Sequence, residues 1–426
     1  MIDLSNYPLN PYRAGPPIKD QPMFFGRHHI FSQVHSHLVG EHLNHPIVIY
    51  GQRRMGKTSV LFQMERSLNA IEGQDRYVTV LLDLQGFTLR GEDHFWYELA
   101  DTIHWEVSRD HLLPEFDEAM FETDALLAFR NSFLPMTQAA LGSRRLVLMF
   151  DESMRLEQVV AEERLPKSIF HDLLTLMHSE RQISFIYSLA TLVSNLQPEY
   201  RALFREALTL HVTFLNDQAA RALVTEPVAK FYKFDEGAEE YLLALTAHHP
   251  YFTQMLCRAL FRRWEQQRFR QARSADVLAV LDQAINSSSD NLNYLWIEAT
   301  VAEKLVLAAM AEMKANRVSV RALDRHLKRA TIYLGPKHIR NALRGLHQRE
   351  IIDSSTYPRI NMGMFRRWLR RAKSVSLVSE EFHEYLPPVP LNTSQEEPEI
   401  SPALRKALTR PWVGYFKGQV HFASLA

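Results

Sequence analysis

Residues 46–58 read PIVIYGQRRMGKT, and this stretch decides the fold. Its first part, the β-branched run from Pro46 to Tyr50, predicts a short buried strand. Its second part, from Gly51 to Thr58, fits the pattern GxxxxGK followed by Ser or Thr at every defined position. Glycines in this pattern let the backbone turn tightly, so that successive N–H groups and the start of the next helix face an anion. The stretch therefore predicts a strand, a phosphate-binding loop and a helix; the alternative is a glycine turn without a ligand.

The residue types in this loop give individual positions a predicted role. Lys57 is a predicted catalytic residue that neutralises the β and γ phosphates, and the Thr58 hydroxyl is a predicted Mg²⁺ ligand. No (N/T)KxD string, which would indicate a guanine nucleotide, occurs in the chain, so ATP is the predicted nucleotide. The predicted nucleotide contacts in the loop are Gly51, Arg54, Met55, Gly56, Lys57, Thr58 and Ser59.

A pair of acidic residues further along the chain completes the predicted site. The apolar run LVLMF at 146–150 predicts a strand, and it ends in Asp151 and Glu152. Asp151 is expected to hold Mg²⁺ through water, and Glu152 to polarise the attacking water as a general base. Two acids at a strand end are common in proteins. At about ninety residues after a phosphate-binding loop, they predict nucleotide hydrolysis.

Apolar runs separated by helical stretches surround these motifs. Predicted strands lie at 46–50, 77–84, 145–152, 183–190 and 210–215, with predicted helices such as 58–71 and 93–107 between them. Continuous apolar strands that alternate with helices indicate a parallel sheet covered on both faces. Residues 1–215 are therefore predicted to form an α/β P-loop NTPase core with a parallel five-stranded sheet.

The rest of the chain is predicted to be largely helical. Amphipathic stretches lie at 216–229, 235–246, 249–267 and 274–285, and the polar stretch NSSSDN at 286–291 is a predicted linker. Residues 299–373 give the order helix, helix, helix, hairpin, helix, which is typical of a winged helix-turn-helix. The Pro-rich, acidic segment at 387–402 is expected to be extended. The predicted domains after the core are 216–290, 291–386 and a linker and tail at 387–426.

Charge is distributed unevenly along the chain. The 49 Lys and Arg balance 49 Asp and Glu, which argues against a uniformly basic, polyanion-binding protein. Residues 299–373, however, contain 17 Lys and Arg and five Asp and Glu, a net charge of +12, and the remainder carries −12. In the predicted recognition helix, GPKHIRNALRGLHQRE, the apolar stripe is Ile339, Leu343 and Leu346, and the outward residues are Lys337, Arg340, Arg344 and His347.

These cations have two alternative partners. One is duplex DNA, whose phosphates Lys337, Arg340 and Arg344 could contact together with Arg359 from the predicted hairpin. FRRWLRRAK at 365–373 adds five more cations. The other alternative is an acidic surface of the same protein. The charge pattern is compatible with both.

Other features narrow the class of protein. The single cysteine, Cys257, is predicted to be buried in a helix; it excludes an internal disulfide and fits a reducing compartment. The chain shows no amino-terminal signal and no apolar stretch of the roughly 18 to 20 residues that span a bilayer, so a cytoplasmic protein without membrane association is predicted. A histidine metal site is disfavoured because the six histidines His28, His29, His35, His37, His42 and His45 share no helical face.

The motifs, taken in order, resemble the AAA+-related STAND ATPases. The similar prokaryotic branch opens with NPYxxGxP, FxGR and GxRRxGKTS; this chain reads NPYRAGPP at 10–17, FFGR at 24–27 and GQRRMGKTS at 51–59. LDLQGF at 82–87 and FDE at 150–152 follow, and EPV at 226–228 and HPYFTQMLCRAL at 249–260 resemble the helical lid of that family. The resemblance covers about residues 8–372. Archaeal origin-recognition proteins share FxGR, the lid and the winged domain.

The resemblance implies further site residues. Phe25, Gly26 and Arg27 would lie near the adenine, and Pro250 would close on the base or ribose from the lid. This chain has His248-His249-Pro250 where relatives carry Gly-x-Pro. After the fourth strand, Thr191 is the candidate sensor of the γ phosphate, with a simple strand-end hydroxyl as the alternative. The candidate arginine fingers are Arg201 and Arg205, each of which would otherwise belong to a solvated helix face.

The resemblance also implies a function. We expect a slow ATPase that acts as a molecular switch in prokaryotic signalling or defence, with a separately encoded effector and nucleotide-dependent homo-oligomerisation. The first alternative is an ATP-dependent DNA-binding or DNA-loading ATPase. The second is a scaffold that binds nucleotide without turnover.

Overall fold

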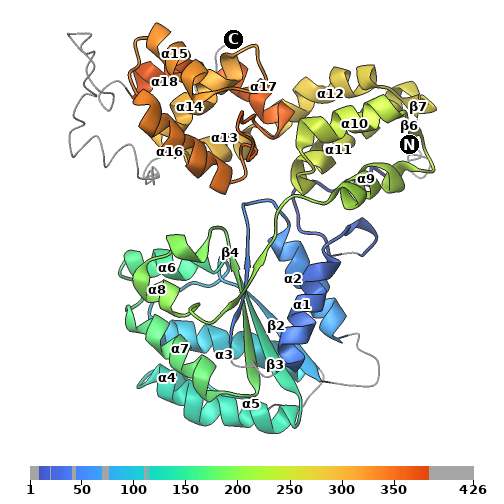
Figure 1. The fold of residues 1–426 in the computed structure, drawn as a ribbon. Coiled ribbons are helices and arrows are strands. Elements are labelled where there is room, and N and C mark those ends of the chain that lie inside the picture. The colour runs from blue at the N-terminus through green and yellow to red at the C-terminus, as the bar shows by residue number, and fades with distance from the viewer. Residues whose placement is uncertain are drawn as a thin grey trace, which may run out of the picture. The chain divides into compact units, whose positions relative to one another are not determined.

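A computed structural model of the chain describes residues 9–19, 21–40, 45–69, 76–109, 113 and 115–382. Two compact units make up the chain (Figure 1). The sheet unit consists of Pro11–Pro227 and His249–Gln254, and the helical unit of Met1–Asn10, Val228–His248 and Met255–Ala426. The predicted tail at 387–426 and His42 lie outside the described residues. The domain boundaries at 215, 290 and 386 remain predictions.

The sheet unit is built on five parallel strands in the order β2-β3-β4-β1-β5. Their bounds are β1 Ile47–Tyr50, β2 Tyr77–Asp83, β3 Arg145–Asp151, β4 Ile183–Leu189 and β5 Leu208–His211. The predicted parallel five-stranded sheet is confirmed. The fifth strand ends earlier than predicted, because pairing with β1 stops where the N–H of Val212 donates to Tyr50 O. The chain then leaves the sheet, and Leu215 lines a cavity.

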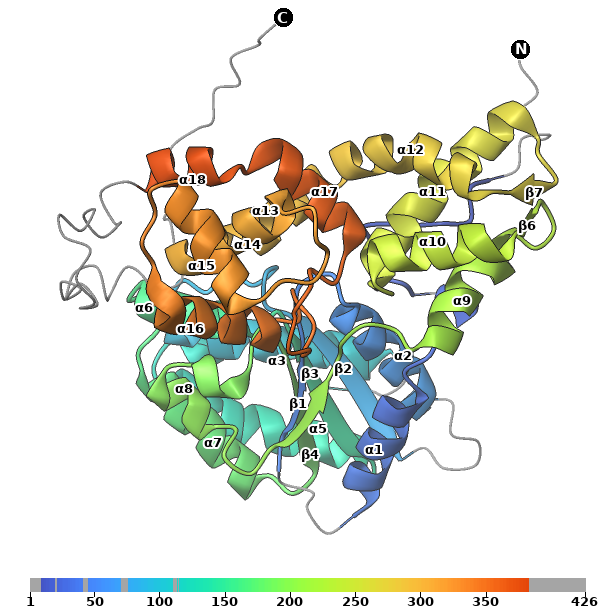
Figure 2. The same cartoon turned by 45° about the horizontal axis from the view of Figure 1, so that its top comes forward.

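Alternate residues of the strands face two separate hydrophobic clusters. On β3, Leu148 and Phe150 belong to one cluster, and Val147 and Met149 to the other. This alternation explains why each strand reads as a continuous apolar run, since both of its faces are buried. Helices α1 His28–Val39 and α2 Lys57–Asn69 cover the second cluster (Figure 1, Figure 2).

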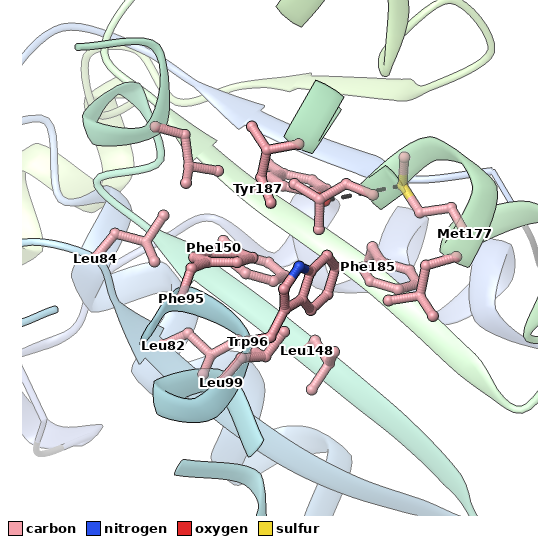
Figure 3. Packing of buried hydrophobic residues seen from close by; sticks show 14 of the residues in the cluster. Leu82, Leu84, Phe95, Trp96, Leu99, Leu148, Phe150, Met177, Phe185 and Tyr187 are labelled. Carbon is pink, nitrogen blue, oxygen red and sulfur yellow. Dashed lines mark hydrogen bonds between the residues drawn. The ribbon is translucent and has the colours of Figure 1, made fainter. Parts of the chain in front are cut away.

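The larger cluster lies under the remaining helices of the unit. These are α3 Glu92–Ser108, α4 Ala125–Ala128, α5 Leu134–Leu141, α6 Met154–Ala161, α7 Ser168–Ser179 and α8 Pro198–Ala202. Short helical turns lie at Gln21–Met23, Glu118–Phe121, Phe129–Phe133, Val193–Asn195 and Glu226–Val228, and α9 Asp217–Thr225 follows β5. Trp96 of α3 is fully buried here (Figure 3). Its ring lies 5.1 Å from both Phe95 and Phe129, so part of this aromatic-rich helix packs on the sheet.

The helical unit begins with four helices. These are α10 Glu236–Thr246, α11 Pro250–Gln267, α12 Ser274–Ser287 and α13 Ser289–Ile297, with a two-stranded parallel pair, β6 Lys233–Phe234 and β7 Gln271–Ala272. Cys257 is buried in α11, as predicted. The predicted linker at 286–291 is wrong. Ser288 is fully buried and its hydroxyl donates to Ala284 O, while α13 buries Leu292, Leu295 and Trp296.

The unit continues with α14 Val301–Glu312, α15 Val320–Arg329, α16 Gly335–Gln348, α17 Gly363–Ala372 and α18 Val375–Glu381. A bridge between Ile352 and Ile360 forms a short hairpin between α16 and α17. Helix α14 is buried almost all round by α15, α16, α17 and α18. The stripe that α16 buries is Ile339, Ala342 and Leu346. Leu343 is only half-buried, because the helix turns Ala342 and Gly345 rather than Leu343 toward α14.

Among the described residues, no helix is long and apolar enough to cross a lipid bilayer.

Candidate nucleotide-binding site

The loop between β1 and α2 has the backbone that its glycines predict. The N–H of Gly51 donates to Leu189 O at the end of β4. A Cβ atom on Gly51 would overlap the backbone oxygen of Val212, so this close approach of β5 requires glycine. Two later positions, Arg54 and Gly56, have φ values of 65° and 93°. The loop therefore turns sharply at the carboxyl edge of the sheet before α2 begins at Lys57.

Lys57 and Thr58 lie at the start of α2. Lys57 is 7% exposed, and its ammonium donates to Gly51 O at 2.9 Å and Gln52 O at 3.1 Å. The Thr58 hydroxyl donates to Oδ2 of Asp151 at 2.6 Å. These contacts place a cation, a hydroxyl and a carboxylate at the amino terminus of one helix, where an anion is favoured.

Asp151 reaches Thr58 although its strand is not next to β1. In the sheet, β4 lies between β1 and β3. Asp151 is 4% exposed. Its second oxygen accepts the N–H of Glu152 at 3.0 Å. Hydroxyl and carboxylate oxygens are the ligands that Mg²⁺ prefers, so Thr58 and Asp151 fit the predicted metal.

Glu152 has an unusual backbone conformation. Its φ is 49°, in the left-handed region that non-glycine residues rarely adopt, and it lines the cavity described below. The next residue, buried Ser153, donates through its N–H and its hydroxyl to Ser188 O at 3.2 and 2.7 Å. The Tyr200 hydroxyl donates to Ser153 O at 2.9 Å. Burial raises the pKa of Tyr200, so its hydroxyl stays protonated, and these hydrogen bonds fix Ser153 next to Glu152.

A cavity of about 290 Å³ lies over the loop. This volume is close to the lower limit for small-molecule sites. Gly56, Lys57, Thr58, Gln85 and Glu152 line it near the loop. Apolar side chains line it elsewhere, namely Met23, Phe24, Phe25, Leu215 and Leu223, and the first turns of α11 contribute Pro250, Tyr251 and Gln254. A charged region beside an apolar one suits a molecule with a polyphosphate and a planar base.

Residues 11–19, here called the strap, form another wall of the cavity. The Tyr12 hydroxyl donates to Val224 O at 2.6 Å. The N–H of Ile18 donates to the hydroxyl of Ser59 at 2.9 Å, and Arg54 donates to Gly15 O at 2.7 Å. The sequence analysis predicted no site residue in the strap, so Arg13, Gly15 and Ile18 were missed as cavity residues. The NPYRAGPP motif at 10–17 contains Arg13 and Gly15 but not Ile18.

The FFGR motif joins the loop to the segment after β5. Gly26 and Arg27 both have positive φ values, 74° and 70°. Arg27 is 7% exposed. Its guanidinium donates to the backbone oxygens of Met55, Thr213 and Phe214. Arg27 therefore braces the cavity wall, and Phe25 and Arg27 both line the cavity.

His249 precedes the lining residue Pro250. Its ring is fully buried, 4.6 Å from the ring of Phe252 and 6.0 Å from that of Phe214. Burial lowers the pKa of His249 to about 3, with a smaller effect from the positive charge of Arg27. The imidazole is therefore neutral at physiological pH.

Other predicted residues lie away from the cavity. Thr191 is not among the residues that line it, and its hydroxyl accepts a hydrogen bond from Asn195. On β4, the buried hydroxyl of Ser188 has no hydrogen-bond partner in the described part of the chain. Arg201 and Arg205 are exposed, and Arg201 donates to Ser194 O. The roles predicted for Thr191, Arg201 and Arg205 remain predictions.

The cations of the helical unit fall into two groups. In one group, Arg359 pairs with Asp353 at 3.3 Å, and Arg367 and Arg371 pair with Asp282 at 3.0 and 2.7 Å. In the other group, exposed cations form no side-chain hydrogen bond or ion pair within the described ranges. This group includes Arg321, Arg325 and Arg329 of α15, and Lys337, Arg340 and Arg344 of α16.

Comparison with solved structures finds similar folds. A Walker-type ATPase of Pyrococcus abyssi is 13% identical with a TM-score of 0.57, over 83% of this chain and 98% of that one. The Aeropyrum pernix ORC2 protein, solved in ADPNP and ADP complexes, is 13% identical with a TM-score of 0.52, over 89% and 96%. These similarities show that the sheet unit has the α/β fold of a P-loop NTPase core. No family model and no curated protein matches it.

Proposed function

We propose that the chain binds ATP and Mg²⁺ and hydrolyses the nucleotide slowly, as a molecular switch of the AAA+-related STAND class. The observation that carries this proposal is the 2.6 Å hydrogen bond from Thr58 to Asp151, beside a cavity lined by Lys57 and Glu152. The likeness in fold to a Walker-type ATPase and to a protein solved with ADPNP and ADP supports it.

Different residues of the site have different proposed roles in hydrolysis. Lys57 leaves Gly51 O and Gln52 O and binds the phosphates, as the loop N–H groups do. Thr58 and Asp151 would hold Mg²⁺, which would supply neutralisation of the phosphate charge. Glu152 accepts a proton from the attacking water while the oxygen of that water forms a bond to the γ phosphorus. The bond from that phosphorus to the bridging oxygen breaks, which gives ADP and inorganic phosphate.

The helical segments have a proposed role in this switch. Residues 216–290 would form a lid that closes on the nucleotide through Pro250, and residues 291–386 a winged helix-turn-helix formed by α14, α15, α16, the hairpin and α17. The element order in 301–372 supports the second assignment. ATP and ADP would favour different arrangements of these domains, which is how a nucleotide switch signals.

Replacing Glu152 by Gln tests the catalytic role. We expect phosphate release to fall by roughly 100-fold or more, because a general base contributes at least that factor, while ATP affinity stays nearly unchanged. Glu163→Gln is the matched control, since Glu163 is exposed, also has a positive φ of 59° and does not line the cavity. Equal phosphate release by wild type and Glu152→Gln would contradict the catalytic role and favour a scaffold that binds ATP without turnover.

Partners follow from the same proposal. We propose a cytoplasmic protein of prokaryotic signalling or defence that forms nucleotide-dependent homo-oligomers and acts on a separately encoded effector. Arg201 or Arg205, both exposed, would reach a neighbouring copy as an arginine finger. Measurement of the mass in solution with and without ATP tests the oligomer.

A second candidate function is ATP-dependent binding or loading on duplex DNA. The observation that favours it is the group of exposed cations on α15 and α16 without partners among the described side chains. Lys337, Arg340 and Arg344 belong to this group, whereas Arg359 is paired with Asp353. Cations that are not paired within the protein can neutralise phosphates and release counterions.

Duplex binding at several salt concentrations tests this candidate. We expect affinity to fall steeply with salt. Changing Lys337, Arg340 and Arg344 together to Ala should reduce the logarithmic slope by roughly 0.9 for each phosphate that the variant no longer neutralises. Arg371→Ala is the control, because Arg371 is already paired with Asp282. Binding that is absent or insensitive to salt would exclude the DNA function.

A further inference from the structure

Gln254 is a buried polar side chain in the cavity that the proposed chemistry does not use. It lies in α11 one turn after Pro250, so both side chains are on the same face of that helix, and both line the cavity. Gln254 is 7% exposed. A polar side chain so deeply buried usually has all of its hydrogen-bonding groups satisfied.

The orientation of the Gln254 amide follows from its partner in the strap. The backbone N–H of Arg13 donates to Oε1 of Gln254 at 3.2 Å. A backbone N–H cannot accept a hydrogen bond, so the oxygen and not the nitrogen of the amide must face Arg13. The NH₂ group has no partner among the described residues. Gln254 lines the cavity, so this NH₂ group is a donor that a bound ligand can satisfy.

The surroundings indicate which part of a nucleotide would supply this acceptor. The strap that holds Gln254 is itself attached to α9, where the Tyr12 hydroxyl donates to Val224 O. Leu223 beside that attachment lines the cavity, as Phe25 and Pro250 do. The charged groups that suit phosphates, Lys57 and Thr58, come instead from α2. Apolar side chains beside the Gln254 amide fit a planar heterocycle.

We propose that Gln254 recognises the base of the nucleotide, its NH₂ group donating a hydrogen bond to an acceptor nitrogen of adenine. This inference rests on the proposed ATP binding. Gln254 is thus a specificity residue, and the strap has a function, because Arg13 holds the amide in the orientation that offers a donor. A negatively charged side chain of the same shape would offer only acceptors.

Gln254→Glu is the decisive variant, because a carboxylate oxygen can still accept the N–H of Arg13 while the donor is lost. We expect its affinity for Mg·ATP to fall about tenfold or more, and its affinity for inorganic tripolyphosphate, measured by competition, to stay within about twofold. Gln266→Glu makes the same change at an exposed position of α11 and should leave both affinities unchanged. Unchanged ATP binding by Gln254→Glu, or an equal loss of ATP and tripolyphosphate, would overturn the inference.

Nucleotide analogues identify the acceptor. In wild type, one of 1-deaza-, 3-deaza- and 7-deaza-ATP should bind about tenfold more weakly than ATP, and this penalty should disappear in Gln254→Leu. If 2′-deoxy-ATP is the only analogue whose loss of affinity in wild type disappears in Gln254→Leu, Gln254 contacts the ribose, and the assignment to the base is overturned. Failure of the wild-type protein to bind any ATP would overturn the proposed function as well, whereas normal ATP binding by Gln254→Glu overturns this inference alone.

Discussion

At the scale of single residues, His249 makes folding depend on pH. Its ring is buried between Phe214 and Phe252, and neither ring nitrogen bonds to another residue in the described part of the chain. Burial lowers its pKa to about 3, below the ordinary value of about 6.5. As pH falls through this interval, the unfolded chain takes up a proton that the folded chain excludes. The stability due to neutral His249 is therefore complete above about pH 6.5 and lost progressively below it.

We expect this group to remove about 1.4 kcal/mol of stability between about pH 7.5 and 5.5. Urea denaturation of wild type and His249→Phe at the two pH values measures the effect. The variant should lose less stability than wild type by that amount, because Phe cannot take up a proton. The same pH dependence in both proteins would show that His249 does not control it.

The site residues differ in how far the sequence could predict them. Lys57, Thr58 and Asp151 belong to motifs whose chemistry requires one residue type at one spacing, and the structure brings all three together. Gln254 could not be predicted in this way. Its orientation depends on Arg13, a residue 241 positions away in the sequence, and a contact of that length leaves no local pattern.

At the scale of elements, the contact between α16 and α14 depends on a glycine. Glycine inside a helix ordinarily lowers stability by roughly 0.5 to 1 kcal/mol relative to alanine. A Cβ atom on Gly345, however, would overlap the carboxylate of Glu303. Glu303 is 6% exposed, accepts the N–H of Thr300 at 2.8 Å and pairs with Arg349 at 2.8 Å. Its carboxylate cannot move without losing these bonds.

We therefore expect Gly345→Ala to lower the free energy of unfolding by roughly 1 to 3 kcal/mol, in spite of its better helix propensity. Gly237→Ala is the control. Gly237 is also helical, in α10, and a Cβ there would meet its nearest atom at an ordinary 3.4 Å. Denaturant unfolding of both variants checks the pair. A stability gain at Gly345 equal to that at Gly237 would contradict this account of the helix contact.

Elements were predictable where burial alone determines the pattern. The strands β1 to β4 are buried on both faces, and their apolar runs gave bounds within one residue of those observed. The segment 286–291 was misjudged, because its polar composition is typical of a linker while Ser288 satisfies its hydroxyl inside a helix. The end of β5 was also misplaced. Leu215 extends the apolar run in the sequence, but its side chain lines the cavity and does not belong to the sheet.

At the scale of the whole molecule, the net charge of zero conceals a local surplus of cations. Both sequence-based explanations of this surplus find support in the described residues. Asp282 forms ion pairs with cations of α17, and Asp353 pairs with Arg359 of the hairpin, as expected of an acidic surface within the same protein. Other exposed cations have no such partner among the described residues, including Arg321, Arg325 and Arg329 of α15 and Lys337, Arg340 and Arg344 of α16. The variant with Lys337, Arg340 and Arg344 changed to Ala therefore tests cations that have no acidic partner among the described residues.

The backbone of Glu152 has a consequence for the molecule as a whole. A non-glycine residue in the left-handed region costs of order 1 kcal/mol or more, and folded proteins are stable by only about 5 to 15 kcal/mol. The chain thus gives up a measurable share of its folding free energy to place one carboxylate beside the cavity. Ser153 and Tyr200 keep that conformation in place. The catalytic role that we propose for Glu152 would explain why this conformation is kept in spite of its cost in stability.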